Sequence, residues 1–170
     1  YSQMPFKKQG IKKISNILEK IVKYESNGIL KALFLDLDNT LISGVWEEDK
    51  TNIFKTYSNH ENYVYRSLWK IAKKFSYIGT QIIICSKNDN HSIQEALEFI
   101  DPFYKNFITH IDSGWGLKSE RIKQMINKMN IGADSCLFID DNEIEVGSVK
   151  NKIPNLNVIK FDKKTILNDL

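Results

Sequence analysis

Two aspartates, Asp36 and Asp38, directly follow a run of apolar residues and stand two positions apart. Side chains two apart on an extended chain point the same way, so both carboxylates can face one site. One carboxylate can attack phosphorus and form an aspartyl-phosphate, and the other can protonate the leaving oxygen and later activate water. The alternative is a turn that the aspartate side chains merely cap. The spacing predicts phosphoryl-transfer chemistry unless the turn is purely structural.

The strands and helices that must position this pair are predicted to alternate along the chain. Short apolar runs predict buried strands, and apolar residues at helical spacing predict amphipathic helices. The strands are expected at 29–37, 81–85, 107–111, 136–139 and 156–161. The helices are expected at 10–24, 61–77, 90–100 and 119–129, with a loop or small hairpin in 41–60. The alternation predicts an α/β fold, a Rossmann-like three-layer α/β/α sandwich with a mainly parallel sheet and a minimal cap.

Ligands of such sheets bind beyond the carboxyl ends of the strands, and four expected strand ends carry polar side chains. These residues are Asp36 and Asp38 after the first strand, Ser86, Lys87 and Asn88 after the second, Lys118 past the third, and Asp140 and Asp141 at the fourth. The four aspartates would repel one another in a crevice of low dielectric constant. A hard divalent cation such as Mg²⁺ would resolve that repulsion, which makes all four candidate metal residues. Ser86 and Lys118 would donate to the oxygens of the transferring group.

These residues resemble the motifs of the haloacid dehalogenase superfamily of phosphotransferases. The likeness covers the DxDx(T/V) run from Asp36 to Thr40, the strand-end Ser86, the helix-start Lys118 and the acidic pair Asp140–Asp141. The resemblance implies that Asp36 is the nucleophile and Asp38 the general acid/base. It also implies that Asp36, the Asp38 carbonyl and Asp141 hold Mg²⁺, while Asp140 orients a water or Lys118. Asn39 and Thr40, which complete the first motif, are candidate substrate-binding residues together with Ser86, Lys87, Asn88 and Lys118.

A narrower likeness, from about residue 29 to 161, is to the FkbH-like branch of that superfamily. It rests on three runs, from Leu35 to Thr40, from Cys85 to Asp89 and from Phe138 to Asn142, and on Trp115 with Lys118. The resemblance implies a glyceryl transferase of polyketide biosynthesis. Such an enzyme takes a glyceryl group from 1,3-bisphosphoglycerate, releases phosphate and loads an acyl carrier protein. Cys85 would then carry the acyl group as a thioester, although small strand-end cysteines are also common as inert core.

One departure from the branch concerns the segment after the first motif. Relatives usually carry Trp-Gly-Gly-Val there, whereas this chain has Ile42-Ser43-Gly44-Val45 with Trp46 displaced. The departure bears on the shape of the substrate near this loop. It does not affect the phosphoryl chemistry. Besides glyceryl transfer, two other functions stay open: a Mg²⁺-dependent phosphatase acting on a phosphorylated small molecule or phosphoprotein, and a non-catalytic interaction module.

Composition sets broad limits on these functions. The 170 residues suit a single domain, in which 1–26 is a helix that could serve as a linker. A net charge of +3 is too mild to argue for nucleic acid as a partner. No apolar stretch is long enough to span a bilayer. Two cysteines suggest no disulfide framework, so we expect a cytoplasmic protein. The three histidines show no metal spacing.

Overall fold

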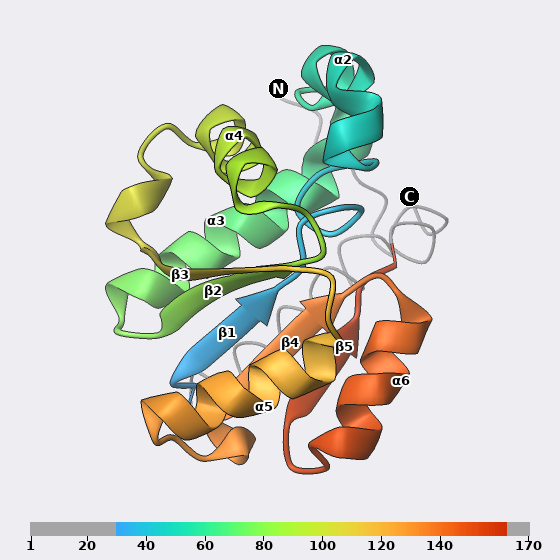
Figure 1. The fold of residues 1–170 in the computed structure, drawn as a ribbon. Coiled ribbons are helices and arrows are strands. Elements are labelled where there is room, and N and C mark those ends of the chain that lie inside the picture. Colours follow the sequence, from blue (N-terminus) through green and yellow to red (C-terminus); the bar gives the residue numbers. More distant parts are fainter. Residues whose placement is uncertain (1–29, 163–170) are drawn as a thin grey trace, which may run out of the picture. The chain divides into compact units, whose positions relative to one another are not determined.

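The computed structural model of the protein describes residues 30–162, which form a five-stranded parallel sheet in the order β3-β2-β1-β4-β5 (Figure 1). The strands are β1 (Ala32–Leu35), β2 (Gln81–Ser86), β3 (Ile108–Ser113), β4 (Cys136–Asp140) and β5 (Asn157–Lys160). Each expected strand is present, and every pairing is parallel. The helix expected at 10–24 and the linker segment 1–26 lie outside the described residues.

Helices cover both faces of this sheet, which confirms the three-layer arrangement (Figure 1). One face carries α3 (Tyr63–Tyr77) and α4 (Asn90–Ile100), and the other carries α5 (Lys118–Met129) and α6 (Glu143–Lys152). Short 3₁₀ turns lie at His60–Asn62, Tyr104–Asn106 and Ala133–Ser135. The fold is therefore the Rossmann-like one expected from the alternating pattern.

The core explains why the central strands read as continuous apolar runs. All four residues of β1 are buried because a strand with helices on both faces has no solvent side. Phe34 of β1 and Phe138 of β4 pack with Ile122 of α5 and Val149 of α6 in one cluster. On α3, residues at spacings of three and four are buried, among them Trp69, as we expected.

The segment after β1 differs from our expectation of a loop or small hairpin in 41–60. It contains helix α2 (Trp46–Thr56). Trp46 and Ile53, seven positions apart, are its buried residues. Three acidic residues in the first turn and Lys55 in the last complement the helix dipole. The single buried stripe is narrow, which is why the apolar pattern looked irregular.

Helix α6 was not among the helices predicted from the sequence. Asn142 caps it by accepting hydrogen bonds from the backbone N–H groups of Ile144 and Glu145.

Within residues 30–162, no helix combines the length and the apolar character that crossing a membrane requires. Both cysteines, Cys85 and Cys136, are free and buried. The cytoplasmic location stays a prediction.

Candidate active site

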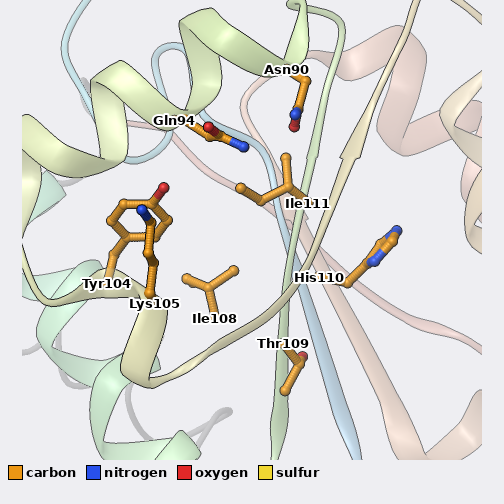
Figure 2. A pocket seen from close by; sticks show the side chains of 8 residues that line it. All are labelled: Asn90, Gln94, Tyr104, Lys105, Ile108, Thr109, His110 and Ile111. Carbon is orange, nitrogen blue, oxygen red and sulfur yellow. The ribbon is translucent and has the colours of Figure 1, made fainter.

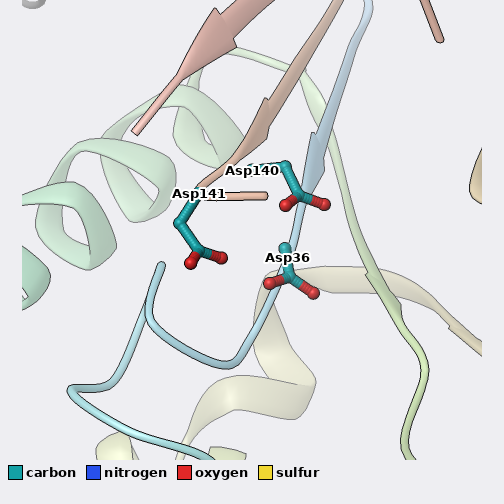
Figure 3. A group of neighbouring side chains, drawn as sticks. All are labelled: Asp36, Asp140 and Asp141. Carbon is teal, nitrogen blue, oxygen red and sulfur yellow. The ribbon is translucent and has the colours of Figure 1, made fainter. Parts of the chain in front are cut away.

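Three carboxylates meet where β1 and β4 end (Figure 3). Asp36 directly follows β1, Asp140 is the last residue of β4, and Asp141 comes next. The two strands are paired in parallel, which brings their carboxyl ends to the same edge. One oxygen from each carboxylate lies within 4.8 Å of the others. The carboxylate of Asp38 is not part of this group; the metal contact that the resemblance implies for Asp38 is through its backbone carbonyl and stays a prediction.

Lys118, the first residue of α5, neutralises part of this charge. Its ammonium donates to Asp36 Oδ1 at 2.6 Å and to Asp140 Oδ2 at 2.7 Å. The Lys118 side chain is 4% exposed, and the side chains of Asp36 and Asp140 are 8% and 0% exposed. Buried charges need such paired geometry to be tolerated. The pairing places Lys118 beside the aspartates, and its role in phosphate binding stays a prediction.

The electrostatics of the group follow from burial. Burial raises the pKa of Asp36 to about 7; Lys118 opposes this shift, and the charge of Asp140 adds to it. Burial, and then Asp140, also raise the pKa of Asp141. For Lys118 burial works against the charged form, but Asp36 and Asp140 outweigh it, and the lysine pKa is raised. The site therefore holds more negative charge than one ammonium offsets.

Thr40 connects the ends of the two strands. Its hydroxyl lies 3.5 Å from Asp36 Oδ2, to which it donates, and accepts from the backbone N–H of Asp141 at 3.1 Å. The residue is fully buried. Thr40 therefore contacts Asp36 and the backbone of Asp141 and does not line the cavity, whereas the sequence predicted that it binds substrate.

Asp38 is held by two donors from different elements. Its Oδ1 accepts from the backbone N–H of Trp46 at 2.9 Å, and its Oδ2 accepts from Asn88 Nδ2 at 2.8 Å. Burial raises the pKa of Asp38, and these two hydrogen bonds oppose the shift. Helix α2 has no side-chain cap of its own in the residue before it, so Asp38 satisfies one of its first N–H groups.

A small cavity of about 210 Å³ opens onto these side chains. It is lined by Asp36, Asp38, Asn39, Val45, Ser86, Lys87, Lys118, Asp140, Asp141, Asn142 and Glu145. Ser86 is 1% exposed, and its Oγ accepts from the backbone N–H of Asn88. Lys87 forms an ion pair with Glu145. The structure thus gathers most of the residues that we singled out around one cavity.

Asn39 lines the cavity and also stabilises the turn between Asp38 and α2. It adopts a left-handed conformation with φ of 53°, which Asn tolerates better than most residues. Its Oδ1 accepts from the backbone N–H of Gly44 at 3.0 Å. Gly44 itself has φ of 109°, where a Cβ atom would lie 2.7 Å from Asp49 Oδ2. These two residues fold the turn that leads from Asp38 into α2.

Cys85, like Thr40 and Asn88, does not line this cavity. Its side chain belongs to the core cluster on the α5 and α6 face. The thiol donates to Asp112 Oδ2 at 3.0 Å, and Arg121 Nη2 lies 3.7 Å from the sulfur. Burial, and then the charge of Asp112, hold the thiol pKa well above its ordinary value. A nucleophilic role for Cys85 stays a prediction, and this environment disfavours the thiolate that it requires.

Two larger hollows lie elsewhere. One, of about 350 Å³, follows the outer edge of β3 below α4 (Figure 2). Its lining residues are Asn90, Gln94, Tyr104, Lys105, Ile108, Thr109, His110 and Ile111. The other, of about 610 Å³, lies beside α4 and is lined in part by Phe54, Phe99 and Tyr104. The first has no carboxylate in its wall, and neither contains residues of the strand-end group. The volume of a cavity alone therefore does not identify the candidate active site.

Two residues of the site escaped sequence reasoning. The Trp46 amide holds Asp38 because α2 begins there, and the acidic run Glu47–Asp49 was a signal for that helix start. Glu145, 5% exposed, reaches the cavity from the first turn of α6. The spacing of Asn142 and Glu145 matches an N-cap followed by an acid three residues later, a pattern that could have revealed the helix.

The donor set fits a hard divalent cation. Carboxylate oxygens are the ligands that Mg²⁺ prefers, and it is bound through one or two of them plus waters and phosphate oxygens. The described residues offer three such carboxylates within reach of one another beside an open cavity. Asp140 already shares its Oδ2 with Lys118, and its Oδ1 accepts from the backbone N–H of Asn142 at 2.7 Å. Asp36 also pairs with Lys118 through Oδ1, but its Oδ2 accepts only the longer 3.5 Å contact from Thr40 among the described residues, and Asp141 is partly exposed; these two carboxylates therefore have the greater freedom to bind a cation.

Known proteins share this architecture. The N-terminal part of a Bacteroides fragilis protein, which contains a phosphatase domain and was crystallised with Mg, has 28% identity and a TM-score of 0.73. The likeness covers 90% of this chain and 42% of that one, so this chain spans less than half of that relative. A haloacid dehalogenase family enzyme from Bacteroides thetaiotaomicron, complexed with magnesium and inorganic phosphate, shares the fold at 14% identity and a TM-score of 0.51, over 79% of this chain and 95% of that one.

A hydrolase from Streptococcus pneumoniae also shares the fold, at 14% identity and a TM-score of 0.54, over 82% of this chain and 99% of that one. None of the curated proteins compared with this sequence matches it. The fold and the acidic strand-end site define the haloacid dehalogenase type of phosphatase. Residues 31–164 match the NLI interacting factor-like phosphatase family, and the chain belongs to that family. The FkbH-like likeness stays a prediction.

Proposed function

We propose that this protein is a Mg²⁺-dependent phosphatase that hydrolyses a phosphate ester of a small molecule through an aspartyl-phosphate on Asp36. One observation carries the proposal: Asp36 lies beside Asp140 and Asp141 and within 2.6 Å of the Lys118 ammonium, at the wall of an open cavity. Membership of a phosphatase family supports it.

In the first step, an oxygen of Asp36 forms a bond to phosphorus, and the bond from phosphorus to the ester oxygen breaks. Asp38 gives its proton to the leaving oxygen, so an alcohol departs. In the second step, Asp38 takes a proton from a water molecule that attacks the aspartyl-phosphate. The bond from phosphorus to Asp36 breaks, inorganic phosphate is released, and both aspartates return to their starting states.

The cation would be held by Asp36 and Asp141, with the Asp38 carbonyl as a third ligand by resemblance. Bound Mg²⁺ supplies positive charge that stabilises the phosphoryl oxygens during transfer. The chain's own residues add to this charge. Lys118 and the Ser86 hydroxyl would donate to phosphoryl oxygens, and Asp140 would hold Lys118 in place, which its 2.7 Å hydrogen bond supports.

The direct test compares wild-type protein with Asp36→Asn in phosphate release from p-nitrophenyl phosphate with Mg²⁺. We expect Asp36→Asn to lose activity by at least about 10³-fold, because removing a nucleophile leaves only the binding and electrostatic terms. Glu143→Gln is the matched control, since Glu143 is an exposed acid of the same edge that pairs with Lys160. Absence of turnover in the wild type with a broad panel of phosphate esters would leave the non-catalytic interaction module as the better description.

Glyceryl transfer is the second candidate, and the run Cys85-Ser86-Lys87-Asn88 favours it through its likeness to the FkbH-like branch. In that function the glyceryl group of 1,3-bisphosphoglycerate would pass to the Cys85 thiol and then to an acyl carrier protein, with phosphate released. The position of Cys85 directly before Ser86, which lines the cavity, is compatible with it. The buried thiol with its raised pKa weighs against it.

Intact mass separates the two functions. The protein is incubated with Mg²⁺ and 1,3-bisphosphoglycerate, and its mass is then measured. A glyceryl adduct that is lost in Cys85→Ala supports transfer. Phosphate release that Cys85→Ala leaves unchanged, without an adduct and without loading of a carrier protein, supports the simple phosphatase.

A further inference from the structure

Asn88 lies between two groups of the candidate site and contacts both. It follows β2 in the loop before α4 and is 5% exposed. Its Nδ2 donates to Asp38 Oδ2 at 2.8 Å, and its backbone N–H donates to Ser86 Oγ at 3.3 Å. From the sequence we expected this side chain to bind substrate. Its amide instead donates to the carboxylate of Asp38, which lies 50 positions earlier in the chain.

The second oxygen of Asp38 is fixed from the opposite side. Its Oδ1 accepts from the backbone N–H of Trp46, the first residue of α2, at 2.9 Å. Two donors from two different elements therefore set the plane of this carboxyl group. Each carboxyl oxygen has two lone pairs, so both hydrogen bonds can persist while one oxygen carries a transferable proton.

The helix that supplies the amide donor is itself anchored. Trp46 is fully buried, and its indole Nε1 donates to Glu95 Oε2 on α4 at 3.3 Å. Lys50 of α2 forms an ion pair with the same carboxylate. Since α4 directly follows the Asn88 loop, the two donors that hold Asp38 are tied to each other through α2 and α4.

Ser86 gains a defined orientation from the same residue. Because its Oγ accepts from the Asn88 N–H, the hydroxyl hydrogen is left to donate elsewhere, and Ser86 lines the cavity. Asn88 thus orients a proton donor for phosphate through its backbone and the acid/base group through its side chain. Only the second of these contacts depends on the identity of the side chain.

We propose that Asn88 is a positioning residue, whose side chain holds the Asp38 carboxyl in the orientation for proton transfer to the leaving oxygen. This inference rests on the proposed phosphatase function. An amide neither gives nor takes a proton in this reaction, so Asn88 acts through Asp38. Its contribution must therefore grow with the leaving oxygen's need for a proton.

The test uses two substrates that differ in that need. The leaving phenolate of p-nitrophenyl phosphate departs readily without a proton, whereas the alkoxide of glycerol 2-phosphate does not. The kcat/KM values of wild type, Asn88→Ala and Asp38→Asn are measured on both substrates with saturating Mg²⁺, because kcat/KM reports the step that releases the alcohol, whereas hydrolysis of the aspartyl-phosphate is common to both substrates. General acid catalysis contributes about 10²–10⁴-fold, so loss of orientation in Asn88→Ala should cost about 10-fold more on the alkyl ester than on the aryl ester.

Asn62→Ala is the matched control. Asn62 is 4% exposed, and its Nδ2 donates to a backbone oxygen, that of Thr56, at 2.9 Å. It does not line the cavity. Loss of this buried amide should lower stability and leave the ratio of the two kcat/KM values as in the wild type. Asn88→Asp, which keeps the shape but replaces the donor by an acceptor, should show the same substrate difference as Asn88→Ala.

The outcomes separate this inference from the proposed function. If Asp38→Asn shows the substrate difference and neither Asn88 variant does, Asn88 has no positioning role. A loss of kcat/KM in the Asn88 variants that is equal for both substrates would make Asn88 a substrate ligand and overturn the inference. So would unfolding of both Asn88 variants, since the residue would then be structural. If Asp38→Asn itself shows no difference, or the wild type is inactive, the proposed function fails first.

Discussion

Lys118 Nζ donates to Asp36 Oδ1 at 2.6 Å, across 82 positions of sequence. The bond ties the start of α5 to the end of β1, and a second bond at 2.7 Å ties the same ammonium to Asp140 at the end of β4. One cation thus faces three clustered carboxylates. Because of the residual negative charge, we expect a divalent cation bound at this edge of the sheet to stabilise the fold as well as to serve the chemistry.

Removal of the Lys118 ammonium should destabilise the metal-free protein. Lys118→Ala leaves Asp36 and Asp140 buried without their partner, and breaking a buried pair costs about 3–5 kcal/mol. We therefore expect a lower free energy of unfolding in EDTA, and a larger stabilisation by Mg²⁺ than in the wild type. Urea unfolding with and without Mg²⁺ checks this.

The control for that prediction is Lys152→Ala. Lys152 pairs with Glu120 at the surface, where both side chains are more than two-fifths exposed. Surface pairs contribute little to stability, so this variant should unfold like the wild type. Equal stability of Lys118→Ala and Lys152→Ala would show that the buried ammonium is not needed to balance the carboxylates.

Asp141 should matter for the cation more than for the fold. Its oxygen belongs to the clustered group, yet the residue is only partly buried. We expect Asp141→Asn to weaken Mg²⁺ binding by at least about 10-fold, which is the loss seen even for groups that only support metal ligands. Isothermal titration with Mg²⁺ measures this, with Glu143→Gln as the neighbouring acid that should bind as the wild type does. An unchanged dissociation constant for Asp141→Asn would remove Asp141 from the ligand set.

The stabilisation by Mg²⁺ should depend on pH. The pKa of Asp36 is raised to about 7, so the folded metal-free protein keeps a proton there that the unfolded chain has released. That contribution to stability is full at low pH and is lost as the pH rises through about 7. Mg²⁺ favours the ionised carboxylate, so its stabilisation should grow over the same range.

The measurement is the difference in Tm between Mg²⁺ and EDTA, from about pH 6 to about pH 8, where a group with a pKa of about 7 titrates. The difference should increase with pH in the wild type. In Asp36→Asn the titrating group is gone, and the curve should be flatter. A difference in Tm that falls as the pH rises would contradict the assignment of the raised pKa to a cation-binding carboxylate.

Much of this site was predictable because its residues follow strands. The apolar runs before Asp36, Ser86 and Asp140 are long enough to identify strands, and parallel strands place their carboxyl ends at one edge. Once the strands were located, the meeting of these residues followed from topology. Lys118 was predictable for the same reason, as the first residue of a helix with a clear apolar stripe.

The partners of these residues were less predictable. The buried residues of helix α2 are only Trp46 and Ile53, so the sequence shows no clear helical spacing of apolar residues there. Because the helix was not predicted, the Trp46 backbone N–H that binds Asp38 was not predicted either. The face of the sheet to which a strand-end side chain points also depends on its position in the alternating pattern of the strand. Cys85 and Ser86 are adjacent and alternate in direction, so Ser86 faces the cavity while Cys85 faces the core of the α5 and α6 side.

That alternation gives a prediction for Cys85. The thiol is buried, donates to Asp112, and has a pKa well above its ordinary value, so little of it is thiolate near neutral pH. Since the thiolate is the reactive form, alkylation by iodoacetamide in the folded protein should be at least about 10-fold slower than in urea. Mass spectrometry of the peptide that contains Cys85 measures the rate.

Cys136 provides the internal standard, because it is also buried and its pKa is raised to about 11. Both cysteines should react slowly and at similar rates. Cys85→Ser should also release phosphate from p-nitrophenyl phosphate at a rate within about 3-fold of the wild type, since conservative core changes act on stability rather than on the reacting atoms. Rapid labelling of Cys85 but not of Cys136 would mean that its contacts with Asp112 and Arg121 open to expose the thiol, and it would favour glyceryl transfer over simple hydrolysis.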